Sequence, residues 1–243
     1  MKKTLLYFLL SFSAYGAHLP EFTQGEIKIN YPCGTETLIS KNKEAKEAIT
    51  FFERGNNELY QEGYILRRRV SEGERDFTIK YRSKDFFSVN GNYYQELLSS
   101  VMGEFKCEYD FTYHPQGTNF SRSCSFKSET VMPLPEHNDF TSMIGKEIEG
   151  GLHIHSMKEV SVQSISWKVK LTPQEEQESP FTKRPSLEKW TVRDECRLEI
   201  SGKLSNLSPE AVEAGFQFLL RLVPETPSPE QGSKTSWALG VRY

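Results

Sequence analysis

Two neighbouring stretches of this chain alternate basic with apolar residues: Tyr64-Ile-Leu-Arg-Arg-Arg-Val70 and Phe77-Thr-Ile-Lys-Tyr-Arg82. In an extended strand, successive side chains point to opposite faces of the sheet. The first stretch therefore places Arg67 and Arg69 on one face and its apolar residues on the other. The second stretch separates its basic from its apolar residues in the same way. Both stretches are predicted to be strands with one cationic face.

The link between the two strands, Ser71-Glu-Gly-Glu-Arg-Asp76, is rich in turn-forming residues and predicts a hairpin. If Val70 faces Phe77, then Arg67 lies opposite Lys80. Like charges directly across a ladder are destabilising. A cationic face of this kind needs either water or an anion, and this choice is the functional question for the chain.

The N-terminus has the pattern of a secretory signal peptide. Lys2 and Lys3 precede an apolar run that ends at Phe12, and small residues follow as far as Ala17. The run is too short to span a membrane. We expect residues 1–17 to be cleaved and the mature chain, from about His18, to be exported as a periplasmic or secreted protein that does not span the membrane. An uncleaved N-terminal anchor is the alternative.

The length of residues 18–243 suits a single β-rich domain. The chain has 30 basic and 33 acidic residues and a formal net charge of −3, so nothing in its overall charge favours nucleic acid as a partner. An anion site must therefore be local. The sequence leaves the oligomeric state open.

The chain has four cysteines, an even number that predicts disulfides in an exported protein. Cys107 and Cys124 flank a turn that contains Pro, Gly and Asn, and we pair them with each other. Cys33 and Cys196 then form the second pair. Four cysteines allow three connectivities, so this pairing is an expectation.

The remaining elements follow from periodicity and capping residues. We expect strands at Gln24–Tyr31, Phe105–Tyr113, Ser121–Lys127, Gly151–Met157, Val160–Leu171 and Trp190–Ile200. We expect helices at Thr35–Phe52 and Tyr93–Met102 and a closing helix with Ser208 as its N-cap and Pro209 at its first position. Thr172–Lys189 is expected to be a loop, Val223–Ser236 a loose Pro-rich segment and Trp237–Tyr243 an edge strand.

In these motifs the chain resembles the CYTH, or triphosphate tunnel metalloenzyme, superfamily. Its opening Glu-x-Glu-x-Lys motif is similar to Gln24-Gly-Glu26-Ile-Lys28, in which Gln replaces the first Glu. Its Tyr-Leu-Arg-x-Arg strand resembles the run that starts at Tyr64, and its Thr-x-Lys strand resembles Thr78-Ile-Lys80. A late Leu-Glu strand resembles Leu198-Glu199.

The resemblance implies an α+β fold: an antiparallel, tunnel-like β-barrel with a charged lumen and flanking helices. It implies a phosphate-rich anion as the ligand, and Mg or Mn as a cofactor for hydrolysis of a triphosphate or polyphosphate. The implied metal ligands are Glu26 and Glu199. The implied phosphate-binding residues are Lys28, Arg67, Arg69, Lys80 and Arg82, with Lys168 and Lys170 as weaker candidates. Because Gln24 removes a carboxylate, we expect the chain to bind the anion, and hydrolysis is a further hypothesis that depends on this binding.

Other interpretations remain open. The basic hairpin could be an ordinary sheet with one solvated face. The chain could instead be a periplasmic carrier or envelope-assembly protein whose pocket is lined by an aromatic stripe: Phe105, Tyr109, Phe111 and Tyr113. His153 and His155 could reach one metal ion from a strand face, although solvent-facing histidines are the simpler reading. No cysteine or serine nucleophile motif is visible.

Overall fold

A computed structural model of the chain describes residues 24–72, 74–83, 104–128, 157–229 and 232–241. The strands are β1 Gly25–Tyr31, β2 Lys41–Glu53, β3 Tyr64–Ser71, β4 Glu74–Ser83, β5 Glu104–His114, β6 Gly117–Ser128, β7 Lys158–Val169, β8 Ser186–Val192 and β9 Glu195–Leu204. The helices are a 3₁₀ turn at Thr35–Leu38 and α1 Glu58–Gln61, α4 Pro173–Glu178, α5 Pro209–Leu222 and α6 Lys234–Leu239. The predicted α+β class with mostly antiparallel strands is therefore confirmed.

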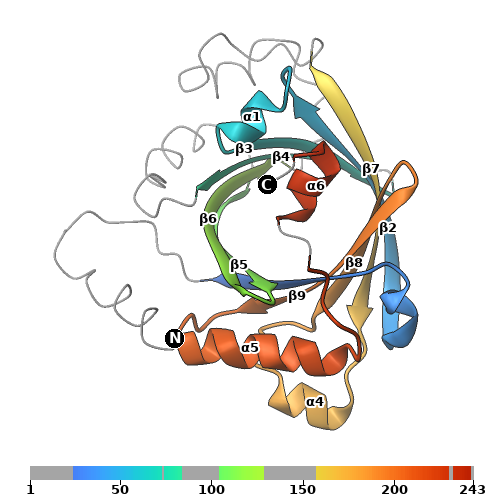
Figure 1. Cartoon of the computed structure of the whole chain (residues 1–243), viewed down its shortest axis with the longest axis vertical. Helices are drawn as coiled ribbons and strands as arrows, with labels where there is room; N and C mark the ends of the chain where they lie inside the picture. Colours follow the sequence, from blue (N-terminus) through green and yellow to red (C-terminus); the bar gives the residue numbers. More distant parts are fainter. Residues whose placement is uncertain (1–23, 73, 84–103, 129–156, 230–231, 242–243) are drawn as a thin grey trace, which may run out of the picture.

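Hydrogen bonding orders the strands as β1-β5-β6-β4-β3-β2-β7-β8-β9, and β1 also pairs with β9, so that the order closes on itself as a barrel. All of these pairs are antiparallel except β1 with β5, which is parallel. In Figure 1 the strands form a ring, with α5 outside it and α6 within it. The ring gives every strand an inward and an outward face.

The β3–β4 hairpin forms as predicted, but its register was predicted wrongly by two residues. Arg67 lies opposite Thr78 and Arg69 opposite Asp76, instead of Arg67 opposite Lys80. A shift of two residues keeps every side chain on its predicted face. The observed register relieves the like-charge pair and pairs Ser71 with Glu74, and Glu72, which follows Ser71, has a positive φ of 46°.

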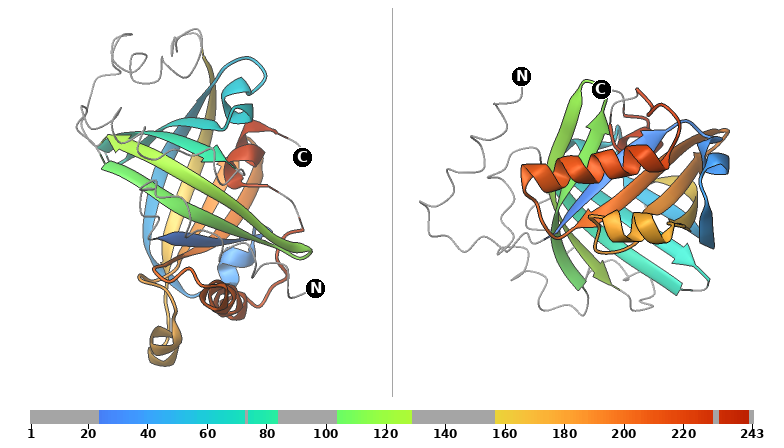
Figure 2. Two further views of the ribbon diagram at one scale, coloured as in Figure 1. Left: turned by 90° about the vertical axis from the view of Figure 1, so that its left-hand side faces the viewer. Right: turned by 90° about the horizontal axis from the view of Figure 1, so that it is seen from below.

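The main apolar core lies outside the ring, between the strands and α5. It contains alternate residues of β1 and β9, such as Ile27 and Ile200, packed against Phe216 and Leu219 of α5. A methyl group on Gly215 would lie 2.3 Å from the Ile27 side chain, so glycine allows the helix to approach the sheet closely. Figure 2 shows α5 lying across the outside of the strands.

The start of α5 confirms the predicted cap. The Ser208 hydroxyl accepts a hydrogen bond from the Ala211 backbone N–H, and Pro209 occupies the first position of the helix. The backbone N–H at the first position of a helix has no partner within the helix. Proline, which lacks this N–H, therefore begins the helix without loss of a hydrogen bond.

The predicted helix at Thr35–Phe52 is wrong. Only the 3₁₀ turn Thr35–Leu38 forms, and β2 follows from Lys41 to Glu53. The apolar residues at helical spacing suggested a helix, but the run from Ile49 to Phe52 is β-branched and aromatic and suits a strand paired on both edges.

Three further expectations in the C-terminal part are corrected. The predicted loop after Leu171 contains α4, whose N-cap Thr172 forms a capping box with Glu175. The predicted strand Trp190–Ile200 is a hairpin, which turns at Arg193 between β8 and β9. The predicted edge strand at Trp237 is instead the helix α6, capped by Ser233.

The structure contains the predicted Cys33–Cys196 disulfide, across 163 residues. Cys107 is also disulfide-bonded, and it lies opposite Cys124 in the β5–β6 register. The strand Val160–Leu171 is confirmed as β7. The expected signal peptide, the expected helix Tyr93–Met102 and most of the expected strand Gly151–Met157, with His153 and His155, lie outside the described residues. In the described part of the chain, no helix is long and apolar enough to cross a membrane.

Candidate functional site

A cavity of about 1010 Å³ lies inside the ring of strands, and charged side chains line it from nearly every strand. The basic residues in the lining are Lys28, Arg67, Arg69, Lys80, Arg82, Lys106, Lys127, Lys203 and Lys234. The acidic residues are Glu26, Glu47, Glu62, Glu108, Asp110, Glu188 and Glu199. The lining thus has nine basic and seven acidic residues, although the whole chain has a net charge of −3.

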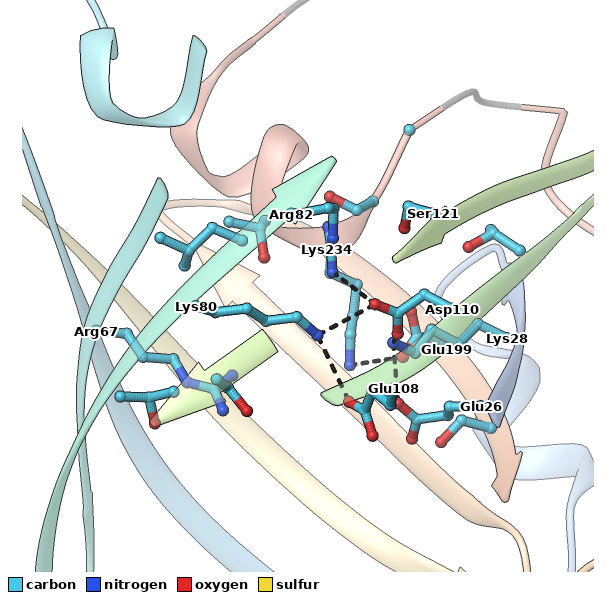
Figure 3. A pocket seen from close by; sticks show the side chains of 18 of the residues that line it. Glu26, Lys28, Arg67, Lys80, Arg82, Glu108, Asp110, Ser121, Glu199 and Lys234 are labelled. Atoms are coloured by element: carbon cyan, nitrogen blue, oxygen red, sulfur yellow. Dashed lines mark hydrogen bonds and ion pairs between the residues drawn. The ribbon is translucent and has the colours of Figure 1, made fainter. Parts of the chain in front are cut away.

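The structure brings together the five principal cations that the sequence pointed to. Lys28 comes from β1, Arg67 and Arg69 from β3, and Lys80 and Arg82 from β4, and all five line the cavity. Figure 3 shows four of them pointing into one space. The charged faces of the strands therefore converge on the interior.

The two weaker candidates do not belong to the site. Lys168 and Lys170 are exposed and are absent from the cavity lining. Lys168 lies at the end of β7 and donates a hydrogen bond of 2.6 Å to the Ser186 hydroxyl. Lys168 lies on the same face of β7 as Ser166, which lines the cavity, as the alternation predicts. It lies beyond the part of the strand that borders the cavity, and the alternation could not predict this.

Asp110 on β5 is the most heavily bonded carboxylate of the cavity. Lys28 donates to its Oδ1, while Lys80 at 3.1 Å and Ser123 at 3.0 Å donate to its Oδ2. Arg82 lies 3.5 Å from the same oxygen. Burial alone would raise the pKa of Asp110, but Lys28, Lys80 and Arg82 hold it well below its usual range.

Glu108, two residues earlier on the same face of β5, has a similar environment. Lys106 forms a hydrogen bond with it, and Lys80 lies 3.5 Å away. Burial would raise the pKa of Glu108, but Lys80 and the neighbouring lysines outweigh this effect and lower the pKa to about 2. Lys28 shows the reciprocal effect: burial opposes its charge, yet Asp110 and Glu26 raise its pKa well above the usual range.

Three carboxylates in this region could hold a metal ion. Oxygens of Glu26, Glu108 and Asp110 lie within 4.8 Å of one another. Glu26 was predicted as a ligand; Glu108 and Asp110 were not, although β5 alternates Lys106, Glu108 and Asp110 with apolar residues and this pattern could have identified them. Glu26 and Asp110 come close because they lie opposite each other in the register of the parallel β1–β5 pair.

The other predicted ligand, Glu199, lies in the cavity but belongs to a second cluster. Lys234, the first residue of α6, contacts both Glu188 on β8 and Glu199 on β9, the latter at 3.1 Å. The Lys234 ammonium also lies 4.7 Å from the centre of the Trp190 ring. Burial raises the pKa of Glu199, against the opposing effect of Lys234. No pattern in the sequence pointed to Lys234, which lies in a segment expected to be loose.

Arg67 differs from the other cations that line the cavity. No carboxylate of the described residues lies within ion-pair distance of its guanidinium, and its buried Nε, like that of Arg69, has no hydrogen-bond partner there. Its neighbour Arg69, in contrast, lies 3.0 Å from Glu47. Burial and then the nearby Arg69 lower the pKa of Arg67 to about 10. The guanidinium of Arg67 is therefore available to donate charge-assisted hydrogen bonds to a ligand in the cavity.

The aromatic stripe does not form a pocket. Tyr109, Phe111 and Tyr113 lie on the outward face of β5 and are absent from the cavity lining. Phe111 and Tyr113 pack against the core beneath α5, where the Tyr113 and Phe216 ring centres are 5.8 Å apart. The side chain of Phe105 lies outside the described side chains. The interior therefore suits a charged ligand and not a lipid-like one.

Fold and cavity together define a class of protein: a β-barrel that encloses a basic interior with carboxylates among the cations. Among solved structures, the chain is similar to HpAC1 from Hippeastrum, with 12% identity, 90% of this chain and 96% of that chain covered, and a TM-score of 0.54. HpAC1 is described as an adenylyl cyclase candidate with a dominant triphosphatase activity.

Two further solved structures are similar at lower TM-scores. One is an adenylate cyclase candidate, bh2851, from Bacillus halodurans, with 12% identity, 88% and 98% coverage and a TM-score of 0.45. The other is the PH1819 protein from Pyrococcus horikoshii, with 12% identity, 90% and 99% coverage and a TM-score of 0.45. No family model and no curated protein matches the sequence. The similarity to HpAC1 thus shows a shared fold.

Proposed function

We propose that the cavity binds a phosphate-rich anion, such as tripolyphosphate, in a tunnel-like barrel interior. The observation that carries this proposal is the guanidinium of Arg67, which faces the cavity without a carboxylate partner among the described residues. Guanidinium and ammonium groups form strong, charge-assisted hydrogen bonds with phosphate oxygens. Arg69, Lys80 and Arg82 line the same space and would extend the contact along a linear anion.

The test is calorimetric titration of the whole protein with tripolyphosphate, comparing Arg67→Gln with Lys168→Gln as a matched control. Lys168 was selected by the same sequence pattern but lies exposed and outside the cavity lining. We expect Arg67→Gln to weaken binding about tenfold or more, the equivalent of one charge-assisted hydrogen bond. Lys168→Gln should bind like the wild type. Equal losses in both variants, or no binding by the wild type, would rule out this site.

Hydrolysis of the bound anion is a second candidate function. The similarity to HpAC1, with its described triphosphatase activity, favours it. A released-phosphate assay with tripolyphosphate, in excess EDTA and then with Mg²⁺ or Mn²⁺ supplied in turn, separates an enzyme from a binding protein. Phosphate release that Arg67→Gln abolishes and Lys168→Gln preserves would establish catalysis in this cavity.

We also propose that the chain acts after export, with residues 1–17 removed as a signal peptide. The pattern of Lys2, Lys3 and the following apolar run supports export, and so does the Cys33–Cys196 disulfide, since such bonds persist in oxidising compartments. Mass spectrometry of the protein expressed with its own N-terminus should find a mature chain that starts near His18. An intact Met1 in the purified protein would contradict export by cleavage.

A further inference from the structure

The carboxylates Glu26, Glu108 and Asp110 stand where a metal ion could be held, but lysines already occupy their oxygens. We infer that these lysines take the place of a metal, so that the cavity binds its phosphate-rich anion without a divalent cation. This inference rests on the proposed function and defines the form of the ligand: the free, fully ionised anion and not its metal complex.

The bonding of Asp110 is the first step of the argument. A carboxylate offers about four lone-pair positions. Lys28 uses Oδ1, while Lys80 and Ser123 use Oδ2, with Arg82 3.5 Å from Oδ2 as well. Asp110 is only 4% exposed, so a metal ion would have to share Oδ1 with the Lys28 ammonium or displace one of these groups from a buried site. Breaking such a buried ion pair is unfavourable by several kcal/mol.

Glu108 and Glu26 are occupied in the same way. Glu108 contacts Lys106 and lies 3.5 Å from Lys80 and 3.9 Å from Lys203, while Lys28 lies 2.9 Å from Glu26. Magnesium and manganese ions prefer six oxygen ligands. Of the three carboxylates, only Glu26 has a single basic partner, and one carboxylate is too few to fix such an ion.

The net charge of the cluster also argues against a bound metal ion. The three carboxylates lie within 4 Å of five cations, which gives the cluster a net charge of 5 − 3 = +2 before any ligand binds. These cations are Lys28, Lys80, Arg82, Lys106 and Lys203. A divalent metal would raise this charge further in a poorly solvated space, where repulsion between like charges is strong. A polyanion would lower it. The carboxylates therefore serve to gather and orient the ammonium groups, each of which has three N–H donors to share with a phosphate.

The first experiment is calorimetric titration with tripolyphosphate in excess EDTA and in excess magnesium chloride. We expect binding in EDTA to be at least as tight as in magnesium, because magnesium competes for the free anion. Binding that requires magnesium would overturn this inference and leave the proposed function standing. No binding in either buffer would overturn both.

The second experiment uses Mn²⁺ alone, observed by its electron paramagnetic resonance signal, and needs no phosphate ligand. The wild type should not bind Mn²⁺ below about millimolar concentration, whereas Lys28→Met, which frees oxygens of Glu26 and Asp110, should bind at least about tenfold more tightly. Lys168→Met, with an exposed lysine, serves as the matched control. If Lys28→Met does not fold, Lys106→Met frees Glu108 and tests the same point. Tight Mn²⁺ binding by the wild type, or no gain in either cavity variant, would overturn the inference.

Discussion

The cavity contains two carboxylate clusters that differ in where their lysines come from. On the β1–β5 side, Asp110 and Glu108 are paired with lysines of other strands, such as Lys28 of β1 and Lys80 of β4. On the β8–β9 side, Glu188 and Glu199 share one lysine, Lys234, which α6 brings from the C-terminal part of the chain. The first cluster is part of the barrel wall, and the second depends on how a short helix docks.

The lysines of the two clusters therefore differ in how rigidly they are held. Strand lysines are fixed by the hydrogen-bonded register of the barrel, so their charges are preorganised for a ligand. Lys234 is held by α6, whose apolar residues Ala238 and Leu239 pack on Ile49 and Phe51 inside the ring. The wall cluster should therefore dominate stability and anion binding, while the α6 cluster should control how the interior is closed at that side.

Removing the central carboxylate of the wall cluster should have the largest effect. Asp110→Asn leaves Lys28, Lys80 and Arg82 without their shared anion in a buried site. We expect the free energy of unfolding to fall by about 3–5 kcal/mol, as measured by urea denaturation. The exposed Asp194, in the β8–β9 turn, provides the control Asp194→Asn.

The same variant also tests the role of the anion. Tripolyphosphate should stabilise Asp110→Asn by more than it stabilises the wild type, because the ligand supplies the missing negative charge. A loss in stability no larger than that of the Asp194 control would show that the wall cluster is not preorganised by Asp110.

A smaller, pH-dependent effect is expected from the α6 cluster. Lys234→Met removes the lysine that Glu188 and Glu199 share, and we expect a loss of about 2–3 kcal/mol at about pH 8. Burial already raises the pKa of Glu199. An acid with a raised pKa in the folded state destabilises the fold as the pH rises through that pKa, so the loss should be smaller at about pH 5 than at about pH 8.

Stability curves at the two pH values check this expectation, with the exposed Lys183→Met as the control. Fluorescence of Trp237, which packs beside Arg197, should report whether α6 undocks. A loss that is equal at both pH values would mean that Glu199 does not accept the proton.

Much of the wall cluster could be predicted because it follows from strand alternation. Period two placed Arg67 and Lys80 on the charged faces of their strands, and a register error of two residues did not change these faces, which point into the cavity. Alternation says nothing of which carboxylate a lysine will meet, since this depends on which strands pair. The parallel β1–β5 pair, which places Glu26 opposite Asp110, joins strands far apart in the sequence.

The α6 cluster could not be predicted for a different reason. Helix α6 has only six residues, fewer than an isolated helix needs to be stable, and its sequence Lys234-Thr-Ser-Trp-Ala-Leu239 has no clear helical period. The helix forms because Ser233 caps it and because its apolar side fills one part of the barrel interior. Such tertiary causes also explain β2, where pairing on both edges overrode an apparent helical pattern.

The smallest expected effect concerns acid stability and distinguishes the two clusters by the pH range in which the loss disappears. The pKa of Glu108 is lowered to about 2 in the folded protein, so Glu108 contributes stability above its ordinary pKa, and this contribution is lost as the pH falls towards 2. Glu108→Gln should therefore be less stable than the wild type by about 1–2 kcal/mol at neutral pH. The difference should vanish only at about pH 2, whereas the loss expected for Lys234→Met should already shrink between about pH 8 and about pH 5. Urea denaturation across this range provides the measurement. A difference that persists unchanged into strong acid would show that Glu108 acts through packing and not through its charge. The wall cluster would then not be stabilised by the pairing of Glu108 with lysines.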